Sequence, residues 1–226
     1  MTSNSSLDLV YQDDCLLMVN KPAGLLAVPG RGADKQDCLS SRLQREFPDA
    51  MVVHRLDMST SGLMVFARGA WMQRRLSQMF QGREVKKRYE ALVTGRLEPE
   101  TGEINLPIVA DWPNRPLSKI DAELGKSSQT RYRTVQVEGP GDLGHSPING
   151  RVGSGLLEAT RVELEPVTGR THQLRLHMSA IGHPILGDAL YGDAASAPRL
   201  MLHATRLEFL HPLTGAPLHF ACPPPF

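Results

Sequence analysis

The sequence predicts an α+β fold. Short apolar stretches typical of strands are interspersed with two segments of helical period, and no regular strand–helix–strand spacing runs along the chain. This irregular order argues against a doubly wound parallel sheet. At 226 residues, a chain of this size buries roughly 70% of its unfolded surface. We therefore expect a single domain over residues 1–226, with a core large enough to be stable without disulfide bonds.

In the first half of the chain, each expected element follows from apolar spacing and from residues that break it. Leu39, Leu43 and Phe47 recur at intervals of four before Pro48, which predicts one helix. A second helix ends at Gly82, and its apolar stripe consists of Met72, Leu76, Met79 and Phe80. We interpret these methionines and aromatics as core rather than as a cofactor site. Strands are expected at 7–11, at 16–19 and at 63–67, and a further strand is expected to end at Val53.

In the second half, we expect strands at 89–93, 129–137, 156–164, 200–209 and 218–221. A helix is predicted to begin near Thr171, whose hydroxyl is a candidate N-cap. The segment from Glu138 to Gly155 (138–155) is rich in Gly and Pro and has no apolar period. It predicts an exposed loop, and a neutral insertion is favoured over an accessory contact because surface loops tolerate insertions well.

Composition excludes several classes of protein. Cys15, Cys38 and Cys222 are scattered and form no C-x-x-C pair, which argues against disulfides and thiolate zinc sites and favours a reducing cytoplasm. No apolar run is long enough to span a membrane. Phosphate-binding loops and dinucleotide fingerprints are absent, so no cofactor is expected. His172 and His177 are five residues apart and face different sides of a helix, so we expect no metal.

The most informative stretch runs from His54 to Gly62. It places Asp57 between the basic Arg55 and a turn of small residues, on a loop between two buried strands. Such loops hold catalytic groups in position and leave them accessible. A carboxylate there can act on an anionic or sugar-like substrate. The alternative is that Asp57 caps a turn and Arg55 is its surface partner, which is the commoner role of an isolated Asp.

Four motifs together make the chain resemble the RluA family of pseudouridine synthases. They are, in the family's order, Asn20–Leu25, His54–Gly62, Lys87–Ala91 and Thr168–His177. The resemblance covers nearly the whole chain. It implies a mixed, mainly antiparallel sheet flanked by helices and loops, and isomerisation of uridine to pseudouridine in RNA without a cofactor. An essential aspartate, Asp57, is implied, together with an active-site tyrosine, Tyr89, and an arginine, Arg175, that pairs with Asp57.

Further residues of these motifs are candidates for substrate binding. Arg170 and the start of the following helix form a corner suited to phosphate. Arg55, beside Asp57, is a candidate for filling the space that an extruded base leaves. The remaining candidates from the same motifs and their flanks are His54, Lys21, Lys86, Lys87, His172 and Leu174.

The net charge of +1 is distributed unevenly. The segment from Arg68 to Arg96 holds eight basic and two acidic residues, a net +6, which leaves −5 for the rest of the chain. This basic stripe is typical of a protein that grips phosphates at one face. From charge alone, a solvated helix face followed by an edge strand protected by lysines is favoured. The position beside the tyrosine motif favours phosphate binding instead.

Within the family, the chain resembles compact dual-specificity members that modify a 23S rRNA hairpin and a tRNA anticodon stem-loop. The run from Asp111 to Pro116 and the absence of an S4-like domain indicate this likeness. The 138–155 loop departs from it. We expect a cytoplasmic monomer. Two alternatives remain: an RNA-binding module without catalysis, and a nucleoside or glycoside hydrolase, although no second acid stands in the Asp57 motif.

Overall fold

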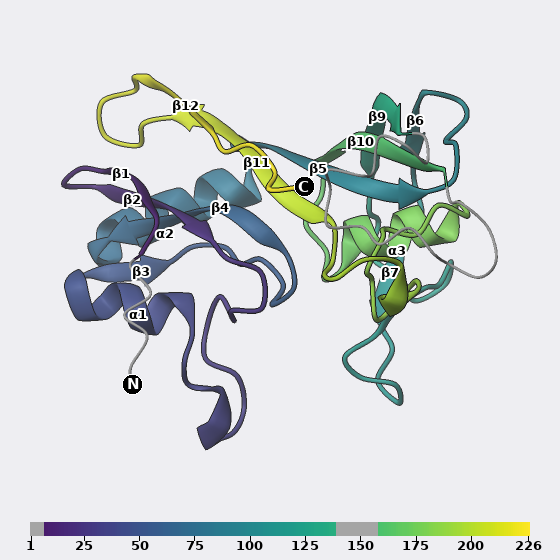
Figure 1. Cartoon of the computed structure of the whole chain (residues 1–226). Coiled ribbons are helices and arrows are strands. Elements are labelled where there is room, and N and C mark those ends of the chain that lie inside the picture. Colours follow the sequence, from purple (N-terminus) through teal and green to yellow (C-terminus); the bar gives the residue numbers. More distant parts are fainter. Residues whose placement is uncertain (1–6, 139–157) are drawn as a thin grey trace. The chain divides into compact units, whose positions relative to one another are not determined.

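A computed structural model describes residues 7–138 and 158–226. Most of the expected 138–155 loop lies outside the described residues. The chain divides into two compact units, which Figure 1 shows coloured along the sequence. The first comprises residues 1–86 and 204–223, and the second residues 87–203 and 224–226. The expectation of one catalytic domain over residues 1–226 stays a prediction.

The first unit contains a sheet with strand order β1-β2-β4-β11, with β3 beside β4 and β12 beside β11. The β1–β2, β2–β4, β3–β4 and β11–β12 pairs are antiparallel. The strands are β1 Leu9–Gln12, β2 Leu16–Lys21, β3 Ala50–Val52, β4 Ser61–Arg68, β11 Leu202–Leu210 and β12 Pro217–Ala221. The helices are α1 Leu39–Glu46, α2 Gly69–Gln81 and the 3-10 turn Ala33–Lys35.

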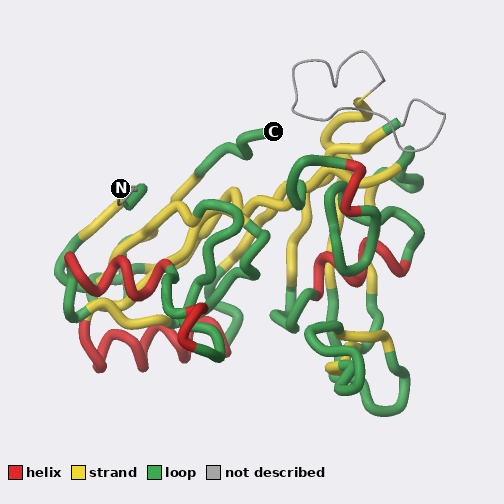
Figure 2. Tube along the Cα trace, turned by 60° about the horizontal axis from the view of Figure 1, so that its bottom comes forward, coloured by secondary structure: helices red, strands yellow, loops and turns green. Residues whose placement is uncertain are grey.

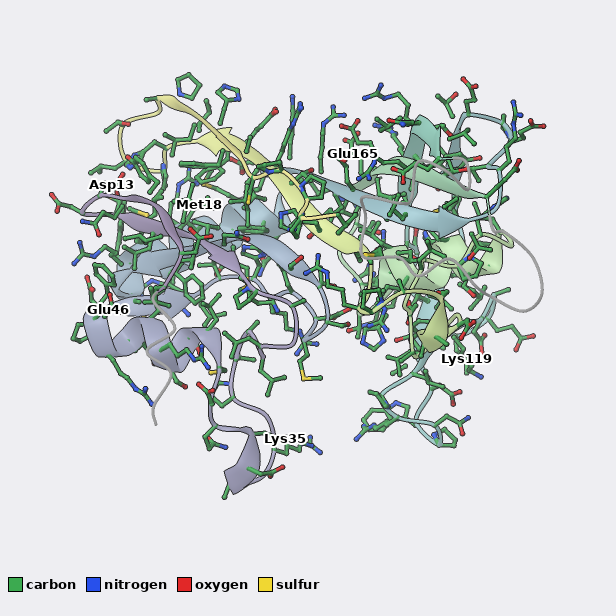
Figure 3. All side chains as sticks on the ribbon, in the orientation of Figure 1. Asp13, Met18, Lys35, Glu46, Lys119 and Glu165 are labelled. Carbon is green, nitrogen blue, oxygen red and sulfur yellow. The ribbon has the colours of Figure 1, made fainter. Side chains whose placement is uncertain are left out.

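Both faces of the central strands β2 and β4 are buried, which explains their unbroken apolar runs. The expected stripe of α2, with Met72, Leu76 and Met79, packs with Leu16 and Val65 in one core. Figure 3 labels Met18 of β2 among the densely packed side chains of this core. The helical spacing of the methionines therefore reflects packing, as the sequence predicts.

The second unit contains a sheet with strand order β5-β10-β9-β6, in which the pairs are antiparallel. A separate antiparallel hairpin is formed by β7 and β8. The strands are β5 Lys86–Thr94, β6 Thr101–Ile104, β7 Ile108–Ala110, β8 Ser118–Ile120, β9 Thr130–Glu138 and β10 Ala159–Pro166, and the helical segments are α3 Gln173–Ala180 and the 3-10 turn Ala194–Ser196. In Figure 2, β7 and β8 are short yellow strands among long green loops.

The predicted α+β class with a mainly antiparallel sheet is confirmed. The expected strands and helices are present, with bounds shifted by a few residues. The sequence analysis did not find β6, β7 and β8, which have only four, three and three residues. Strands this short do not show the alternation on which recognition depends.

Candidate active site

Asp57 lies in the first unit, on the loop between β3 and β4. The backbone N–H of Thr60 donates to the Asp57 carbonyl oxygen at 3.2 Å, which closes a tight turn. Leu56 is buried, Asp57 is half-buried and Arg55 is exposed. The structure therefore anchors this loop through Leu56 and leaves the neighbouring polar side chains nearer the surface, as the position between two strands predicts.

Glycine is required at the end of this motif. Gly62 has a φ of 112°, and a Cβ there would lie 2.4 Å from the Ala204 carbonyl oxygen. Both residues belong to the first unit, so the close approach of β4 and β11 depends on the missing side chain. The motif's glycine thus has a structural explanation that does not require contact with substrate.

Lys21, a predicted substrate-binding residue, is fully buried. Its Nζ donates to the carbonyl oxygens of Pro22 at 2.9 Å, Leu25 at 2.7 Å and Met58 at 3.1 Å. A buried ammonium requires such partners, because each unpaired N–H would carry a large desolvation cost. Lys21 therefore holds the backbone of Met58, the residue that follows Asp57, and its predicted contact with substrate stays a prediction.

His54 begins the Asp57 motif and contacts strand β4, which follows the motif. Its Nε2 accepts the Val65 N–H at 3.0 Å, and its ring stacks on Phe80 with centroids 4.5 Å apart. Because Nε2 acts as an acceptor, the proton of the neutral ring is on Nδ1. These contacts fix His54 against β4 and α2, and its predicted substrate contact stays a prediction.

Arg175 lies in the second unit on α3 and is 4% exposed. Its Nε donates to Asp188 Oδ2 at 2.8 Å and its Nη2 to Asp188 Oδ1 at 2.6 Å. Such a side-on pair fixes the plane of the guanidinium. Sequence reasoning missed Asp188, which lies thirteen residues after Arg175 in a loop without a periodic signal. The predicted pairing of Arg175 with Asp57 stays a prediction.

The surroundings of Asp188 keep its carboxylate charged. Burial acts to raise the pKa of this carboxyl, but the hydrogen bonds and charge of Arg175 outweigh burial, and the net pKa lies below its ordinary value. The backbone N–H groups of Leu190 and Tyr191 donate to Oδ1 at 2.8 and 3.2 Å and favour the charged form further. The buried guanidinium of Arg175 therefore faces a permanent countercharge near neutral pH.

The start of α3 differs from the prediction. The N-cap is His172, in the left-handed conformation with a φ of 57°, and Thr171 as the capping residue is wrong. Because His172 leaves the helical conformation, Thr171 lies outside the first turn. The side chain of Gln173 instead accepts the Arg170 N–H at 3.0 Å and the Thr168 hydroxyl at 2.7 Å. This arrangement orders the turn that carries Arg170.

Tyr191 is a further residue that sequence reasoning missed. Its hydroxyl oxygen accepts the Ser118 N–H at 2.8 Å and lies 2.8 Å from His172 Nδ1. The tautomer of His172 decides which of these two groups donates to the other. The Arg175 guanidinium lies 5.5 Å from the centre of the Tyr191 ring. Burial raises the pKa of Tyr191, so the hydroxyl stays protonated and links His172, Arg175 and the start of β8.

Tyr89 lies on β5 opposite Leu164 and packs, partly buried, against the core of the second unit. In the same unit, Lys87 Nζ lies 3.8 Å from the position that a Cβ on Gly169 would take. Lys87 thus approaches the Thr168–Arg170 turn. Arg170 is exposed, and its guanidinium donates to the Ser127 carbonyl oxygen at 3.2 Å. The fold therefore brings the predicted phosphate-binding residues Lys87 and Arg170 into one corner.

Leu174, another predicted substrate-binding residue, is 7% exposed and belongs to the core of the second unit. Its side chain packs with Met178 and Leu202, among others. A leucine in this core stabilises the helix that carries Arg175, and direct binding of substrate by Leu174 stays a prediction.

Seven of the eight residues of the basic stripe fall into two groups, and the eighth is the half-buried Lys87. Arg68 pairs with Asp49, Arg88 with Glu163, and Arg96 with Glu98. Four members are exposed and have no ion pair among those identified in the described part of the chain: Arg74, Arg75, Arg83 and Lys86. Arg74 and Arg75 follow the exposed Trp71 on α2. This second group is the part of the stripe suited to phosphate contacts.

One cluster in the described residues has potential metal-ligating atoms: those of Asp13, Cys15 and His211 lie within 4.8 Å of one another. The carboxylate of Asp13, labelled in Figure 3, already accepts the Tyr11 hydroxyl, two backbone N–H groups and His211 Nε2. His211 Nδ1 accepts two further backbone N–H groups. These hydrogen bonds account for the cluster without an ion.

The family of RNA pseudouridylate synthases matches this chain over residues 15–180. The chain belongs to this family. The dual-specificity RNA pseudouridine synthase RluA of Yersinia pestis is 46% identical over 217 residues, covering 95% of this chain and 97% of the relative. RluA of Escherichia coli strain K12 is 44% identical over 223 residues, covering 97% and 94%. The predicted family resemblance is therefore confirmed, and the protein is an isomerase that forms pseudouridine in RNA.

Solved structures agree with this assignment. Human RNA pseudouridylate synthase domain containing 1 has a TM-score of 0.76 and 29% identity, covering 98% of this chain and 84% of that protein. Human RNA pseudouridylate synthase domain containing 4 has a TM-score of 0.69 and 25% identity, covering 96% and 88%. Among the described residues, the helices are too short or too polar to cross a membrane.

Proposed function

We propose that Asp57 is the catalytic group of this pseudouridine synthase. The observation that carries the proposal is a half-buried aspartate in the family motif. The residue that follows it, Met58, is held by a hydrogen bond from the buried Lys21 ammonium. Rigid support of a loop on both sides is what a reacting carboxylate needs, because small displacements of a catalytic group cost large factors in rate. Asp57 as a mere turn cap would need no such support.

In the proposed reaction, the bond from ribose C1′ to uracil N1 breaks and a bond from C1′ to C5 forms. Asp57 either attacks C1′ or promotes loss of the C2′ proton. Uracil stays bound and turns, and the C5 proton is lost while N1 gains one, so the product is an isomer of the substrate. Tyr89 would pack against the target base, and Arg175 would pair with the Asp57 carboxylate. No cofactor takes part.

We further propose a structured RNA as substrate, either a 23S rRNA hairpin, a tRNA anticodon stem-loop or both. Two relatives that match this chain over 97% and 94% of their own length are named dual-specificity synthases, which supports more than one RNA. Lys86, Lys87, Arg170 and His172 would contact the RNA, and Arg55 would fill the space of the extruded base. The protein would act as a monomer in the cytoplasm.

The test compares wild type with Asp57→Asn on short uridine-containing hairpins, with carbodiimide-reactive pseudouridine as the readout. We expect the substitution to lower turnover by at least about a thousandfold, since the amide neither attacks nor accepts a proton. RNA affinity should change little. Asp37→Asn is the matched control, because Asp37 is an exposed carboxylate of the same unit that pairs with Arg42.

Each other outcome has a defined meaning. Full turnover by Asp57→Asn would exclude Asp57 as the catalytic group. Free uracil from wild type would indicate hydrolysis, and binding without product would indicate an RNA-binding module. For Arg55, a variant Arg55→Ala that modifies a structured hairpin as fast as wild type would exclude the space-filling role.

A further inference from the structure

The chain has two tryptophans, and both are exposed. Trp71 on α2 is 57% exposed and Trp112 is 68% exposed. Tryptophan carries a large aromatic surface with one polar group and is enriched at interfaces, so an exposed tryptophan is a candidate for a binding residue. Trp112 is the more exposed of the two and lies in the loop of the β7–β8 hairpin.

The hairpin loop is a closed turn. Asp111 N–H donates to the Leu117 carbonyl oxygen at 2.9 Å, and Leu117 N–H to the Asn114 carbonyl oxygen at 3.0 Å. The Asn114 side chain donates to Asp111 Oδ2 at 2.9 Å. Residues 112–116 between these contacts are all exposed. In Figure 1 the chain around β7 extends away from the strands β5, β10, β9 and β6 of its unit. The loop therefore presents its side chains from a defined backbone.

Trp112 is already one half of a stack. The Arg115 guanidinium carbon lies 3.2 Å from the centre of the indole, which is the distance of two planar groups in contact. The arginine covers one face of the ring. Because the residue keeps 68% of its surface exposed, the opposite face remains open to solvent. The pair is thus a flat, cationic and preorganised surface of the kind on which unpaired nucleotide bases stack.

The charges around the stack balance. Arg115, Lys119 and Lys126 are opposed by Asp111, Asp121 and Glu123 within residues 111–126. Lys119, labelled in Figure 3, pairs with Asp121 at 3.3 Å. The exposed arginines of α2 lie in a segment with net positive charge, whereas this hairpin carries none. Attraction to phosphate therefore contributes little here, and base stacking is the interaction that the hairpin offers.

The strand end beside the hairpin loop connects to the predicted site residues of the same unit. Ser118, the first residue of β8, donates its N–H to the Tyr191 hydroxyl, and that hydroxyl bonds to His172. Tyr191 also lies against Arg175. The stack is therefore presented by a strand that is fastened to the residues proposed to bind the substrate. This continuity favours RNA over a protein as the occupant of the platform.

We propose that the Trp112–Arg115 stack binds one unpaired base of the substrate RNA, outside the reacting nucleotide. This inference rests on the proposed action on structured RNA. The platform accepts any base, since every base has a π face, and it discriminates unpaired from paired nucleotides because a base in a duplex is already stacked. The hairpin thus contributes to the choice of a loop-containing RNA over a continuous duplex.

The first experiment measures pseudouridine formation on a stem-loop RNA. We expect Trp112→Ala to raise KM about tenfold with little change in kcat, from the usual contribution of one stacked base. Trp112→Phe keeps a ring and should restore most of the affinity. Thermal unfolding should be unchanged in both variants, because residue 112 is exposed. An unchanged KM for Trp112→Ala on this RNA would overturn the proposal.

Salt dependence provides a control within the chain. The loss of affinity in Trp112→Ala should be equal at low and high salt, because the indole carries no charge that could bind a phosphate. The double variant Arg74→Gln, Arg75→Gln on α2 should instead lower the slope of log affinity against log salt, by about one for each phosphate that the protein no longer neutralises. A Trp112→Ala effect that disappears at high salt would exclude stacking as its cause.

Fluorescence detects the contact directly. The variant Trp71→Phe leaves Trp112 as the single tryptophan, and its emission should be quenched by the stem-loop with a Kd matching that from binding assays. A continuous RNA duplex should quench much less. No quenching by the stem-loop would exclude the platform even if the enzyme makes pseudouridine. Absence of pseudouridine on every RNA would instead contradict the proposed function.

Discussion

The two units hold their predicted catalytic residues by different forces. In the first, the loop of Asp57 is fixed through the backbone, by a buried ammonium that binds carbonyl oxygens and by a glycine that permits close strand approach. In the second, Arg175 is fixed through its charged side chain by the buried carboxylate of Asp188. The Asp57 loop is thus positioned through neutral backbone dipoles, whereas the plane of the Arg175 guanidinium is fixed by a charged partner.

This comparison predicts that the second unit is the more sensitive to loss of a single charge. Removing one partner of a buried ion pair leaves the other charge uncompensated in a medium where water cannot replace it. Removing a hydrogen-bond donor from carbonyl groups leaves neutral dipoles, whose desolvation cost is smaller. The following substitutions test this order, from the largest expected effect to the smallest.

Asp188→Asn should lower the free energy of unfolding by about 3 to 5 kcal/mol, because the Arg175 guanidinium remains buried beside a neutral amide. Denaturant unfolding measures the loss. The activity of the folded fraction should also fall, since the plane of Arg175 is no longer fixed. Asp193→Asn is the matched control: this exposed carboxylate of the same unit accepts a local backbone N–H. Equal losses in the two variants would contradict the importance of the buried pair.

Lys21→Met should cost about 2 to 3 kcal/mol of unfolding free energy, because the carbonyl oxygens of Pro22, Leu25 and Met58 lose their shared donor. Methionine keeps most of the length of the side chain. The effect on kcat should exceed the effect on KM, since the buried Lys21 holds the backbone beside Asp57. Lys35→Met is the control, because Lys35 is exposed in the same unit and is labelled in Figure 3. A large rise in KM with unchanged stability would instead support direct contact between Lys21 and substrate.

The smallest effect concerns pH and His177, a fully buried residue of α3. Its Nε2 donates to the Leu106 carbonyl oxygen at 3.0 Å, and its Nδ1 lies 2.9 Å from the Thr130 hydroxyl. Burial lowers the pKa of His177 in the folded protein. The unfolded chain therefore binds more protons at acidic pH, so this residue's contribution to stability is complete above the unfolded pKa of about 6.5 and is lost as the pH falls below it.

Unfolding measured at about pH 7.5 and at about pH 5 should show this loss in wild type, and the loss should be smaller in His177→Gln. His219→Gln, at an exposed position of β12, should behave like wild type. A pH dependence that is identical in wild type and His177→Gln would show that other groups cause it.

The sequence by itself determined the fold class, the main strands and helices, and the family. The strands and helices depend on residue spacing over short distances, as in the apolar stripe of α2. The family depends on motifs that can be recognised from their order along the chain. It also placed Asp57 on an anchored loop, because the strands on either side are recognisable from their own residues.

Only the tertiary structure decided which polar residues have partners and which motif residues are buried. Nothing in the local pattern distinguishes Lys21 from a surface lysine, or joins Arg175 to Asp188 and Tyr191 to Ser118, since these contacts form between segments that folding brings together. The exposed Trp112–Arg115 stack is of the same kind, because its geometry depends on the turn of a hairpin too short to be recognised by alternation. Burial and pairing are properties of the packed chain, whereas periodicity is a property of neighbours along it.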